Sequence, residues 1–411
     1  MKYISLFSGI GGLEHPKVKP LLFCERDSEC QRILREVHPK VEIANDISAL
    51  VPPKADFVIG GWPCQDLSSA GTLGGLDAKR SGLFFEMLRV SAESGAHTLI
   101  GENVPNLITI NGGADFNRVL EALTNSGFLY ITWRVLNARS FGLPQERRRL
   151  FIVASRHRKH ADALHSKIPD FPRARKRKQP AAFYWTGGKR SICYSVGCSP
   201  ALKIGAADNK GRAPVAVFDG VKIRKLNAIE FLRLQGFNTL PTIGLPSSTL
   251  LRMAGNAVPP PMGQFVISSV FSGADAVGVR SAFGFVAQAG TLCDGMPWVI
   301  DHKPTNLATN LSDYLDSNSD AELLSSQAAA GLIVRSVRSG QPMPIELFEA
   351  LYSLTKDRSA KLRPSRANSF LALDVMVSEL EDYRQSLPST ADYNPKYDDY
   401  EDDIAATDEG E

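Results

Sequence analysis

The fold is indicated first by residues 3–12, which read Tyr3-Ile4-Ser5-Leu6-Phe7-Ser8-Gly9-Ile10-Gly11-Gly12. Residues 3–7 form a short apolar run that predicts a buried strand, and the glycines after it predict a tight turn. A glycine-rich turn after a strand lets the backbone approach a ligand, although such turns also end strands for purely structural reasons. Taken alone, this stretch therefore leaves a binding site and a plain turn both open.

The same alternation continues outward as far as residue 153. Further short apolar runs predict strands at 21–24, 57–59, 98–101, 130–135 and 150–154. The amphipathic stretches between them predict helices at 28–37, 83–91 and 116–126. Because strands alternate with helices, we expect an α/β fold with a doubly wound, mostly parallel sheet and helices on both of its faces.

The pattern changes twice further along the chain. Residues 155–223 are basic, rich in Gly, Pro and Ser, and predicted to be irregular, whereas 228–235 predicts a helix and 264–271 a helix or strand. From about residue 276 small helices are expected at 321–337, 345–354 and 370–383. Residues 388–411 carry nine acids and one lysine, so we expect a disordered acidic tail.

Composition limits the class of protein. With 411 residues, of which 43% are hydrophobic and 22% charged, the chain can bury a core in roughly two or three domains. It contains no run of about 18 apolar residues, and residues 1–15 are too short and polar for a signal peptide, so we expect no membrane span and a cytoplasmic protein. Its six cysteines form no Cys-x-x-Cys pair and are interpreted as free thiols.

The net charge of +3 conceals two halves of opposite sign. Residues 1–275 hold 36 Lys and Arg against 22 Asp and Glu (+14), and residues 276–411 hold 11 against 22 (−11). Within 147–190 there are 14 basic residues and two acids. Such a block neutralises phosphates and favours a nucleic-acid partner, although a solvated loop is an equally good interpretation of the charge alone.

Residues with catalytic chemistry follow two of the predicted strands. Cys64 comes after 57–59 on a loop of glycines and a proline, and Glu102 directly follows 98–101. A lone cysteine is more often a small buried residue, and a lone carboxylate a surface or capping group. The ends of parallel strands share one edge, where open α/β sheets bind ligands, so a nucleophilic thiol and an acid can meet there.

Other polar residues suit a nucleotide-like ligand. Glu25 closes the predicted strand at 21–24, and Asp46 lies near the end of a further strand candidate that comes just before it. Carboxylates at such strand ends can accept hydrogen bonds from a ribose and an adenine amino group. In the segment 145–150, Arg147 and Arg149 alternate and can face one site together while Arg148 faces elsewhere. As an isolated cluster these arginines could equally bind a phosphate.

In this order the motifs resemble those of the cytosine-5 DNA methyltransferase family, from Ile4 to about Met262. The matching motifs are Phe7-Ser8-Gly9-Ile10-Gly11-Gly12, Pro63-Cys64-Gln65, Glu102-Asn103-Val104, Gln145-x-Arg147-x-Arg149, Arg233-Leu234-Gln235-Gly236-Phe237 and Gly255-Asn256-Ala257-Val258-Pro259. Ser5 stands where many members have Asp, Trp62 where Pro or Phe is usual, and Leu67 where Phe is common. None of these departures removes a catalytic group.

The resemblance implies a reaction and a cofactor. Such an enzyme flips a cytosine out of a short specific double-stranded DNA sequence and methylates its carbon 5 from S-adenosylmethionine. Cys64 would form a covalent adduct at carbon 6, Glu102 would hold or protonate the ring nitrogen, and Arg147 and Arg149 would steady the flipped nucleotide. The resemblance further implies cofactor contacts from Phe7, Gly9, Gly11, Gly12, Leu13, Glu25, Asp46, Ile47, Pro63, Leu83, Asn256 and Val258.

The resemblance also implies how the chain is divided. We expect a catalytic domain at 1–154, a target-recognition domain at 155–251, a return segment at 252–275, a helical accessory region at 276–387 and the tail at 388–411. The segment from Gln65 to about Leu83 resembles a mobile loop that closes over DNA. DNA contacts are accordingly expected from Gln65, Ser68, Arg173, Arg175, Lys176, Arg177 and Lys178.

Competing functions remain open at this point. One branch with these motifs methylates transfer RNA, and a catalytically silent DNA-binding homologue would have lost Cys64, Glu102 or a cofactor glycine. A nicotinamide dehydrogenase is disfavoured because a full Gly-x-Gly-x-x-Gly is missing. The spacing of His157, His160 and His165 with the downstream cysteines matches no common zinc site, so no metal is expected. We expect double-stranded DNA as partner, a monomer, and a cognate restriction nuclease by family analogy.

Overall fold

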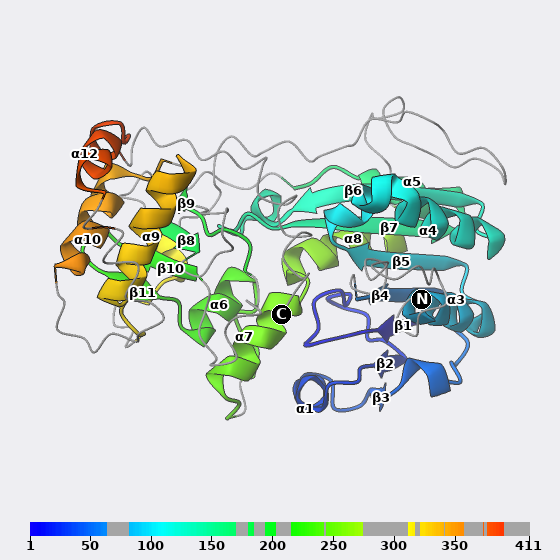
Figure 1. The fold of residues 1–411 in the computed structure, drawn as a ribbon. Helices are drawn as coiled ribbons and strands as arrows, with labels where there is room; N and C mark the ends of the chain where they lie inside the picture. The colour runs from blue at the N-terminus through cyan, green and yellow to red at the C-terminus, as the bar shows by residue number, and fades with distance from the viewer. Residues whose placement is uncertain are drawn as a thin grey trace.

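The computed structural model describes residues 1–63, 82–169, 180–184, 194–202, 215–241, 244–273, 311–316, 321–340, 342–356, 373 and 376–389. The described residues form two lobes, each built on a β-sheet (Figure 1). We call them the catalytic lobe, which contains the larger sheet, and the second lobe, which contains the smaller one.

The larger sheet has seven strands in the order β3-β2-β1-β4-β5-β7-β6. Only β7 runs against its neighbours, so the sheet is mostly parallel as predicted. The strands are β1 (Tyr3–Leu6), β2 (Leu22–Cys24), β3 (Glu42–Ala44), β4 (Phe57–Gly61), β5 (Thr98–Asn103), β6 (Tyr130–Asn137) and β7 (Arg148–Ser155). Every strand that the sequence predicts in this region is confirmed, with ends that differ by a few residues.

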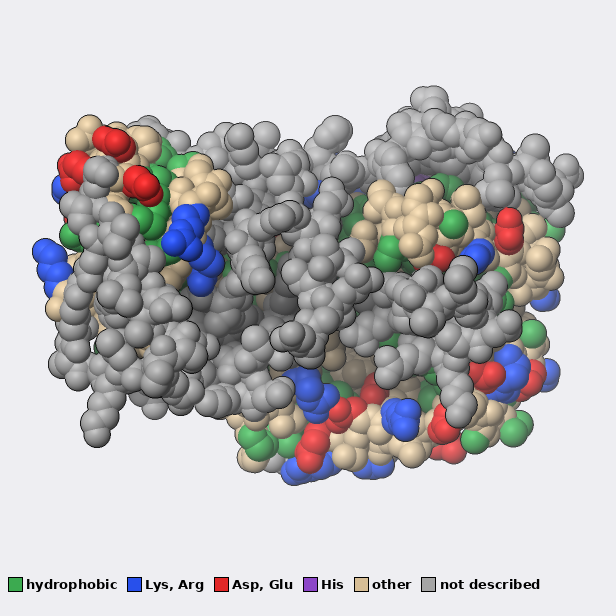
Figure 2. Space-filling model, viewed as in Figure 1, with side chains coloured by type: hydrophobic (Ala, Val, Ile, Leu, Met, Phe, Trp, Pro, Cys, Tyr) green, Lys and Arg blue, Asp and Glu red, His purple; other side chains and the backbone are tan. Residues whose placement is uncertain are grey.

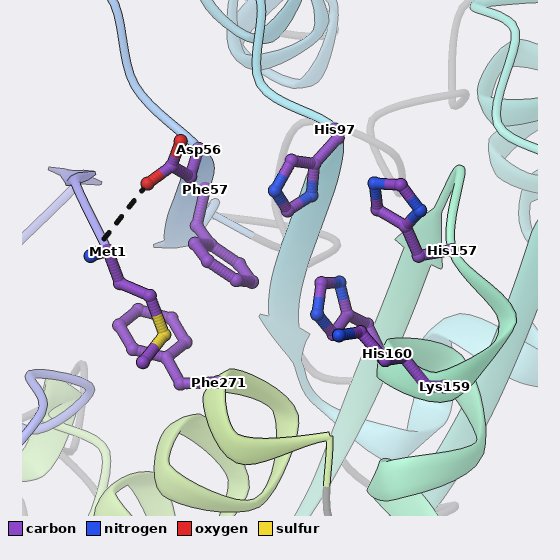
Figure 3. A pocket seen from close by; sticks show the side chains of 8 residues that line it. All are labelled: Met1, Asp56, Phe57, His97, His157, Lys159, His160 and Phe271. Carbon is purple, nitrogen blue, oxygen red and sulfur yellow. Dashed lines mark ion pairs between the residues drawn. The ribbon is translucent and has the colours of Figure 1, made fainter.

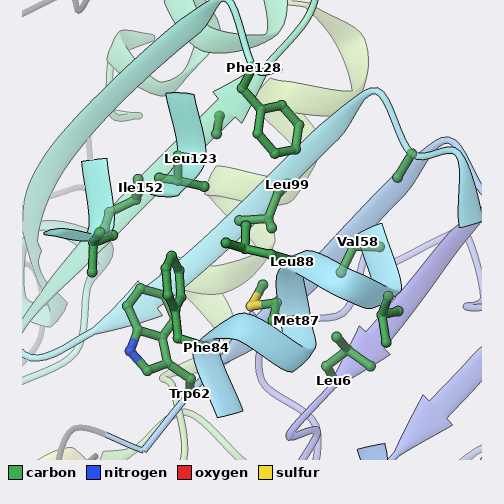
Figure 4. Packing of buried hydrophobic residues seen from close by; sticks show 14 of the residues in the cluster. Leu6, Val58, Trp62, Phe84, Met87, Leu88, Leu99, Leu123, Phe128 and Ile152 are labelled. Carbon is green, nitrogen blue, oxygen red and sulfur yellow. The ribbon is translucent and has the colours of Figure 1, made fainter. Parts of the chain in front are cut away.

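Both faces of this sheet are covered, which explains why its strands are apolar throughout. Successive side chains of a strand point to opposite faces, so Ile4 and Leu6 enter one core while Tyr3 enters the other. The first core lies under α3 (Gly82–Ser94) and α4 (Ala114–Asn125), as Figure 4 shows.

The second core lies under α8 and the segment after β7. The remaining helices of this lobe are α1 (Ser28–Val37), α5 (Arg158–Asp162) and α8 (Pro260–Ser272). Short 3-10 turns occur at η1 (Ile47–Ala49), η3 (Pro105–Ile108), η4 (Ile110–Gly113), η5 (Ala138–Phe141) and η6 (Ala163–His165). The predicted helices on both faces are therefore confirmed, and 264–271 is helical rather than extended.

The second lobe corrects the prediction that 155–223 is irregular. It contains an antiparallel sheet in the order β11-β10-β8-β9. Its strands are β8 (Ala181–Tyr184), β9 (Tyr194–Val196), β10 (Val215–Phe218) and β11 (Ile223–Lys225). Each strand has only three or four residues, so the pairing is defined by contacts between distant segments that a local pattern does not reveal.

Helices cover both faces of this smaller sheet. On one face lie α6 (Ala228–Leu234) and α7 (Ser247–Asn256), of which the sequence predicts only α6. On the other face lie α9 (Ser326–Ser339), α10 (Ile345–Thr355) and α12 (Val377–Gln385), close to the predicted positions. Because these C-terminal helices share one core with the sheet, they are an integral layer of the second lobe.

A buried ion pair ties the layers of the second lobe together. Arg224 on β11 and Glu230 on α6 form two hydrogen bonds of 2.9 and 2.7 Å. Glu230 also accepts hydrogen bonds from two backbone N–H groups. One belongs to Asn227, which caps α6, and the other to Asp316, which follows the 3-10 turn η7 (Leu311–Tyr314). The carboxylate is thus fully hydrogen-bonded, the condition under which a buried charge is tolerated.

Two further features concern the described helices and the molecular surface. None of the described helices is long and apolar enough to cross a bilayer. On the face shown in Figure 2, acidic and basic side chains lie interspersed along the side of the catalytic lobe near α1.

Candidate active site

The predicted site residues gather at one edge of the larger sheet, because its parallel strands end there. Four of them follow β1, β2, β3 and β4, and one lies near the end of β5: Phe7, Glu25, Asp46, Pro63 and Glu102. This is the edge at which open α/β sheets bind ligands.

The glycine loop after β1 forms an open backbone cradle. Gly9 and Gly11 have φ of 56° and 83°, a conformation that favours glycine. The N–H of Gly9 donates to Oε2 of Glu25 at 2.7 Å, which anchors the loop to the end of β2. A Cβ on Gly9 would meet no atom within 4 Å, so the loop leaves room beside its backbone.

The return segment closes this loop from the other side. A Cβ on Gly12 would lie 2.1 Å from the carbonyl oxygen of Val258, and one on Gly263 would lie 2.0 Å from the carbonyl oxygen of Gly12. Neither position can therefore carry a side chain. The turn between α7 and α8, with exposed Asn256 and buried Val258, lies directly against the glycine loop.

The two predicted nucleotide-binding carboxylates differ in their surroundings. One carboxylate oxygen of Glu25 accepts the hydrogen bond from Gly9, and the other accepts a hydrogen bond of 2.8 Å from the N–H of Asp27. Each carboxylate oxygen has a second lone pair, so Glu25 can still accept a hydroxyl. Asp46 is exposed and accepts from the N–H and hydroxyl of Ser48, and its neighbour Ile47 is buried.

Asn103 holds the backbone that leads into the thiol loop. Its amide donates to the carbonyl oxygen of Trp62 at 3.2 Å and accepts from the N–H of Val104 at 2.8 Å. Pro63 is exposed, whereas Cys64, Gln65 and Ser68 lie outside the described residues.

The uncommon Trp62 fits because its neighbour is a glycine. Its ring packs 5.0 Å from that of Phe84 (Figure 4), and a Cβ on Gly101 would lie 2.5 Å from it. Trp62 thereby fills the core at the end of β4.

Glu102 is a buried carboxylate with one arginine partner in contact. Its Oε1 lies 3.1 Å from Nε of Arg149, and burial raises the pKa of the carboxyl while Arg149 and Arg147 act in the opposite direction. A Cβ on Gly61 would lie 2.6 Å from Oε2, so this glycine leaves the space that the carboxylate occupies. A carboxyl group with a raised pKa beside a fixed cation can hold or give a proton.

Arg147 lies in a different environment from Arg149. It is 1% exposed, and its guanidinium donates to the carbonyl oxygens of Leu202, Gly255 and Ala257 at 2.8–2.9 Å. These contacts join β7, the second lobe and the return segment. Among the described contacts, Arg149 alone of the two arginines touches Glu102.

The other predicted residues are placed as follows. Leu83 is half-buried at the start of α3, and Leu13 is buried in the core with Val258. The expected DNA contacts Arg173, Arg175, Lys176, Arg177 and Lys178 lie outside the described residues. Within the part of the chain that the structure describes, no group of three His, Cys, Asp or Glu is arranged to hold a metal ion.

The sequence did not single out two residues that shape this edge, Gly101 and Gly263, and it noted Gly61 only as one of the glycines before Cys64. All three glycines are needed because of what lies opposite them in space. Asn103 belongs to a quoted motif, but its contact with Trp62 crosses from β5 to β4 and has no local signal.

Comparison with known proteins gives consistent matches. The sequence profile of the C-5 cytosine-specific DNA methylases matches residues 1–184. Type II methyltransferase M2.BsuMI of Bacillus subtilis (strain 168) is 33% identical over 282 residues, which cover 63% of this chain and 72% of that protein. M.NgoBI of Neisseria gonorrhoeae and M.HaeII of Haemophilus aegyptius are each 30% identical, over 64% and 66% of this chain and 90% and 93% of their own lengths.

Proposed function

This chain belongs to the C-5 cytosine-specific DNA methylase family, and from this premise we propose that Cys64, Glu102 and Arg149 carry its chemistry. The chain is a DNA cytosine-5 methyltransferase that uses S-adenosylmethionine. The observation that carries the assignment of residues is the buried Glu102 carboxyl in contact with Arg149 at the edge where β4 leads into Cys64.

The chemistry of these groups fits the reaction. The Cys64 thiolate adds to carbon 6 of a flipped cytosine, and Glu102 holds a proton at ring nitrogen 3, so electron density rises at carbon 5. When bound, S-adenosylmethionine supplies an electrophilic methyl group for that carbon. A base then removes the carbon 5 proton, and the thiolate leaves carbon 6 to restore the ring. Arg149 orients Glu102 and opposes the effect of burial on the pKa of its carboxyl group.

The cofactor fits the glycine cradle. The open backbone at Gly9 and the carboxylate of Glu25 would hold its ribose side, and Asp46 with Ile47 its adenine. Phe7, Gly11, Gly12, Pro63, Leu83, Asn256 and Val258 are proposed around it. Arg147 is proposed as a positioning residue, because its guanidinium is engaged by three backbone carbonyls.

DNA is the substrate, and we propose that the second lobe recognises its sequence. The basic block at 173–178 belongs to the chain segment that connects the two lobes and would neutralise phosphates. We further propose that the protein acts as a monomer in the cytoplasm and that it has a cognate restriction nuclease. The Type II names of the relatives support the proposal of a nuclease.

The test is methyl transfer from labelled S-adenosylmethionine to unmethylated duplex DNA and to transfer RNA. Transfer to DNA should be lost in Cys64→Ser and kept in Cys293→Ser, which removes a thiol outside the family motifs. DNA with fluorine at carbon 5 should trap an SDS-resistant adduct with the wild type and none with Cys64→Ser, because the final proton removal is blocked. Transfer to RNA alone, or tight DNA binding without transfer, would contradict the assignment.

A further inference from the structure

A second buried carboxyl group lies beside the glycine loop and is not used by the reaction described above. Glu14 is 9% exposed, and its Oε1 accepts a hydrogen bond of 2.9 Å from the hydroxyl of Ser5 on β1. Its Oε2 is buried and has no hydrogen-bond partner among the described residues. Because an unpaired buried carboxylate is costly, this group favours its neutral form until a positive charge comes close enough to compensate it.

The carboxyl lies directly under the loop. Oε2 is 3.3 Å from the position that a Cβ on Gly11 would occupy, and Gly11 has a left-handed φ of 83°. The hydroxyl of Ser8 bonds to the hydroxyl and the carbonyl oxygen of Ser5, both at 3.0 Å. Ser5, Ser8 and Glu14 therefore form one polar cluster that supports the glycine loop from below.

No described lysine or arginine neutralises this cluster. Burial raises the pKa of Glu14, whereas the Ser5 hydroxyl and nearby backbone N–H groups act in the opposite direction, and among the described residues no lysine or arginine forms an ion pair with it. The loop above holds a cofactor whose sulfur carries a positive charge before methyl transfer and none after it. The positive charge that could compensate Glu14 is therefore one that the bound cofactor would supply at the same loop.

We propose that Glu14 is a positioning residue whose carboxylate favours cationic S-adenosylmethionine over its uncharged thioether product. The inference rests on the cofactor site proposed above. The side chain does not need to touch the ligand, because charges in a protein interior interact beyond contact distance, and an interaction of this kind changes affinity by roughly tenfold.

Position 5 offers a second place from which a charge can act on the same loop. The Ser5 hydroxyl already contacts Glu14, so an aspartate at position 5 would bring a carboxylate beside residue 14. With a neutral residue at position 14, that aspartate would keep one carboxyl group below the loop.

The test compares the affinities of the full chain for S-adenosylmethionine and S-adenosylhomocysteine by calorimetry. In Glu14→Gln the Kd for S-adenosylmethionine should rise roughly tenfold and that for the product less than twofold, so their ratio shrinks. The double variant S5D/E14Q restores the charge from β1 and should recover the wild-type ratio. Glu42→Gln, which neutralises an exposed carboxylate on β3, is the matched control and should change neither Kd.

Three results would overturn the proposal. They are an unchanged ratio in folded Glu14→Gln, equal weakening of both ligands, and failure of S5D/E14Q to recover the ratio. If Glu14→Gln does not fold, Glu14→Met takes its place in the same comparison, with the same shrinkage of the ratio expected. A wild type that binds neither ligand, or whose affinity is unchanged by Glu25→Ala, would overturn the cofactor site as well, so the two failures are distinguishable.

Discussion

At the scale of residues, the missing side chain at position 61 determines where the Glu102 carboxylate lies. The two residues are paired neighbours on β4 and β5, and only a hydrogen at position 61 leaves space for Oε2. The carboxyl group thus stays within reach of Arg149 in the edge that leads to Cys64.

Gly61→Ala should lower kcat about 100-fold and leave cofactor affinity nearly unchanged, because the new Cβ would lie 2.6 Å from Oε2 and displace the carboxylate. Gly82→Ala is the control, since a Cβ there meets no atom within 4 Å. Single-turnover methyl transfer and calorimetry measure the two quantities. Equal kcat values in both variants would contradict this account of Gly61.

Substitution of Arg147 should mainly lower stability, whereas substitution of Arg149 should mainly lower activity. Arg147→Met leaves three buried carbonyl oxygens without their donor and should cost about 3 kcal/mol of unfolding free energy. Arg149→Met should lower kcat about 100-fold, because Arg149 contacts Glu102, and it should destabilise the fold less than Arg147→Met, because the Glu102 carboxyl group can take up a proton when its partner is removed. Urea unfolding and single-turnover rates separate the two effects, and the opposite pattern would show that their roles are exchanged.

At the scale of elements, three histidines lie together at the sheet edge opposite the active site. His97 precedes β5, and His157 and His160 lie at the start of α5, around a cavity of about 370 Å³ (Figure 3). The hydroxyl of Thr98 contacts Nδ1 of both His97 and His160, at 2.9 and 3.0 Å. Burial lowers the pKa of His160 to about 4, and the neighbouring basic groups add to this effect.

The unfolding free energy should therefore decrease in acid. The imidazole of an unfolded chain takes up its proton near pH 6.5, while folded His160 stays neutral, so its contribution is present above about pH 6.5 and is lost as the pH falls toward 4. In His160→Asn, which can still bond to Thr98, this loss should shrink by about 2 kcal/mol. Urea unfolding measured between pH 4 and 7.5 tests this prediction. If the unfolding free energies of the variant and the wild type decrease in parallel as the pH falls, the prediction is wrong.

At the scale of the whole molecule, the C-terminal helices complete the second lobe. Leu332 and Ile333 of α9 and Phe348 of α10 are buried against strands β8 and β10 in one core. A segment that the sequence describes only as an accessory region therefore covers one face of the sheet proposed to recognise DNA.

A chain ended after residue 320 should lose about 5 kcal/mol or more and leave the second lobe unfolded, because several large side chains lose their cover. A chain ended after residue 389 is the matched control, since it keeps all described helices and removes only the acidic end. Thermal unfolding followed by circular dichroism compares them. Equal cooperative transitions in both would show that the C-terminal helices are dispensable.

The sequence by itself determined the larger sheet and the family, because short continuous apolar runs and contiguous motifs such as Glu102-Asn103-Val104 are local and readable in order. Only the tertiary structure decided the small sheet of β8 to β11, whose three- and four-residue strands are defined by their partners. It also separated Arg147 from Arg149 and placed Glu14 under the loop. Burial and hydrogen-bond partners come from segments distant in the chain, so no local pattern encodes them.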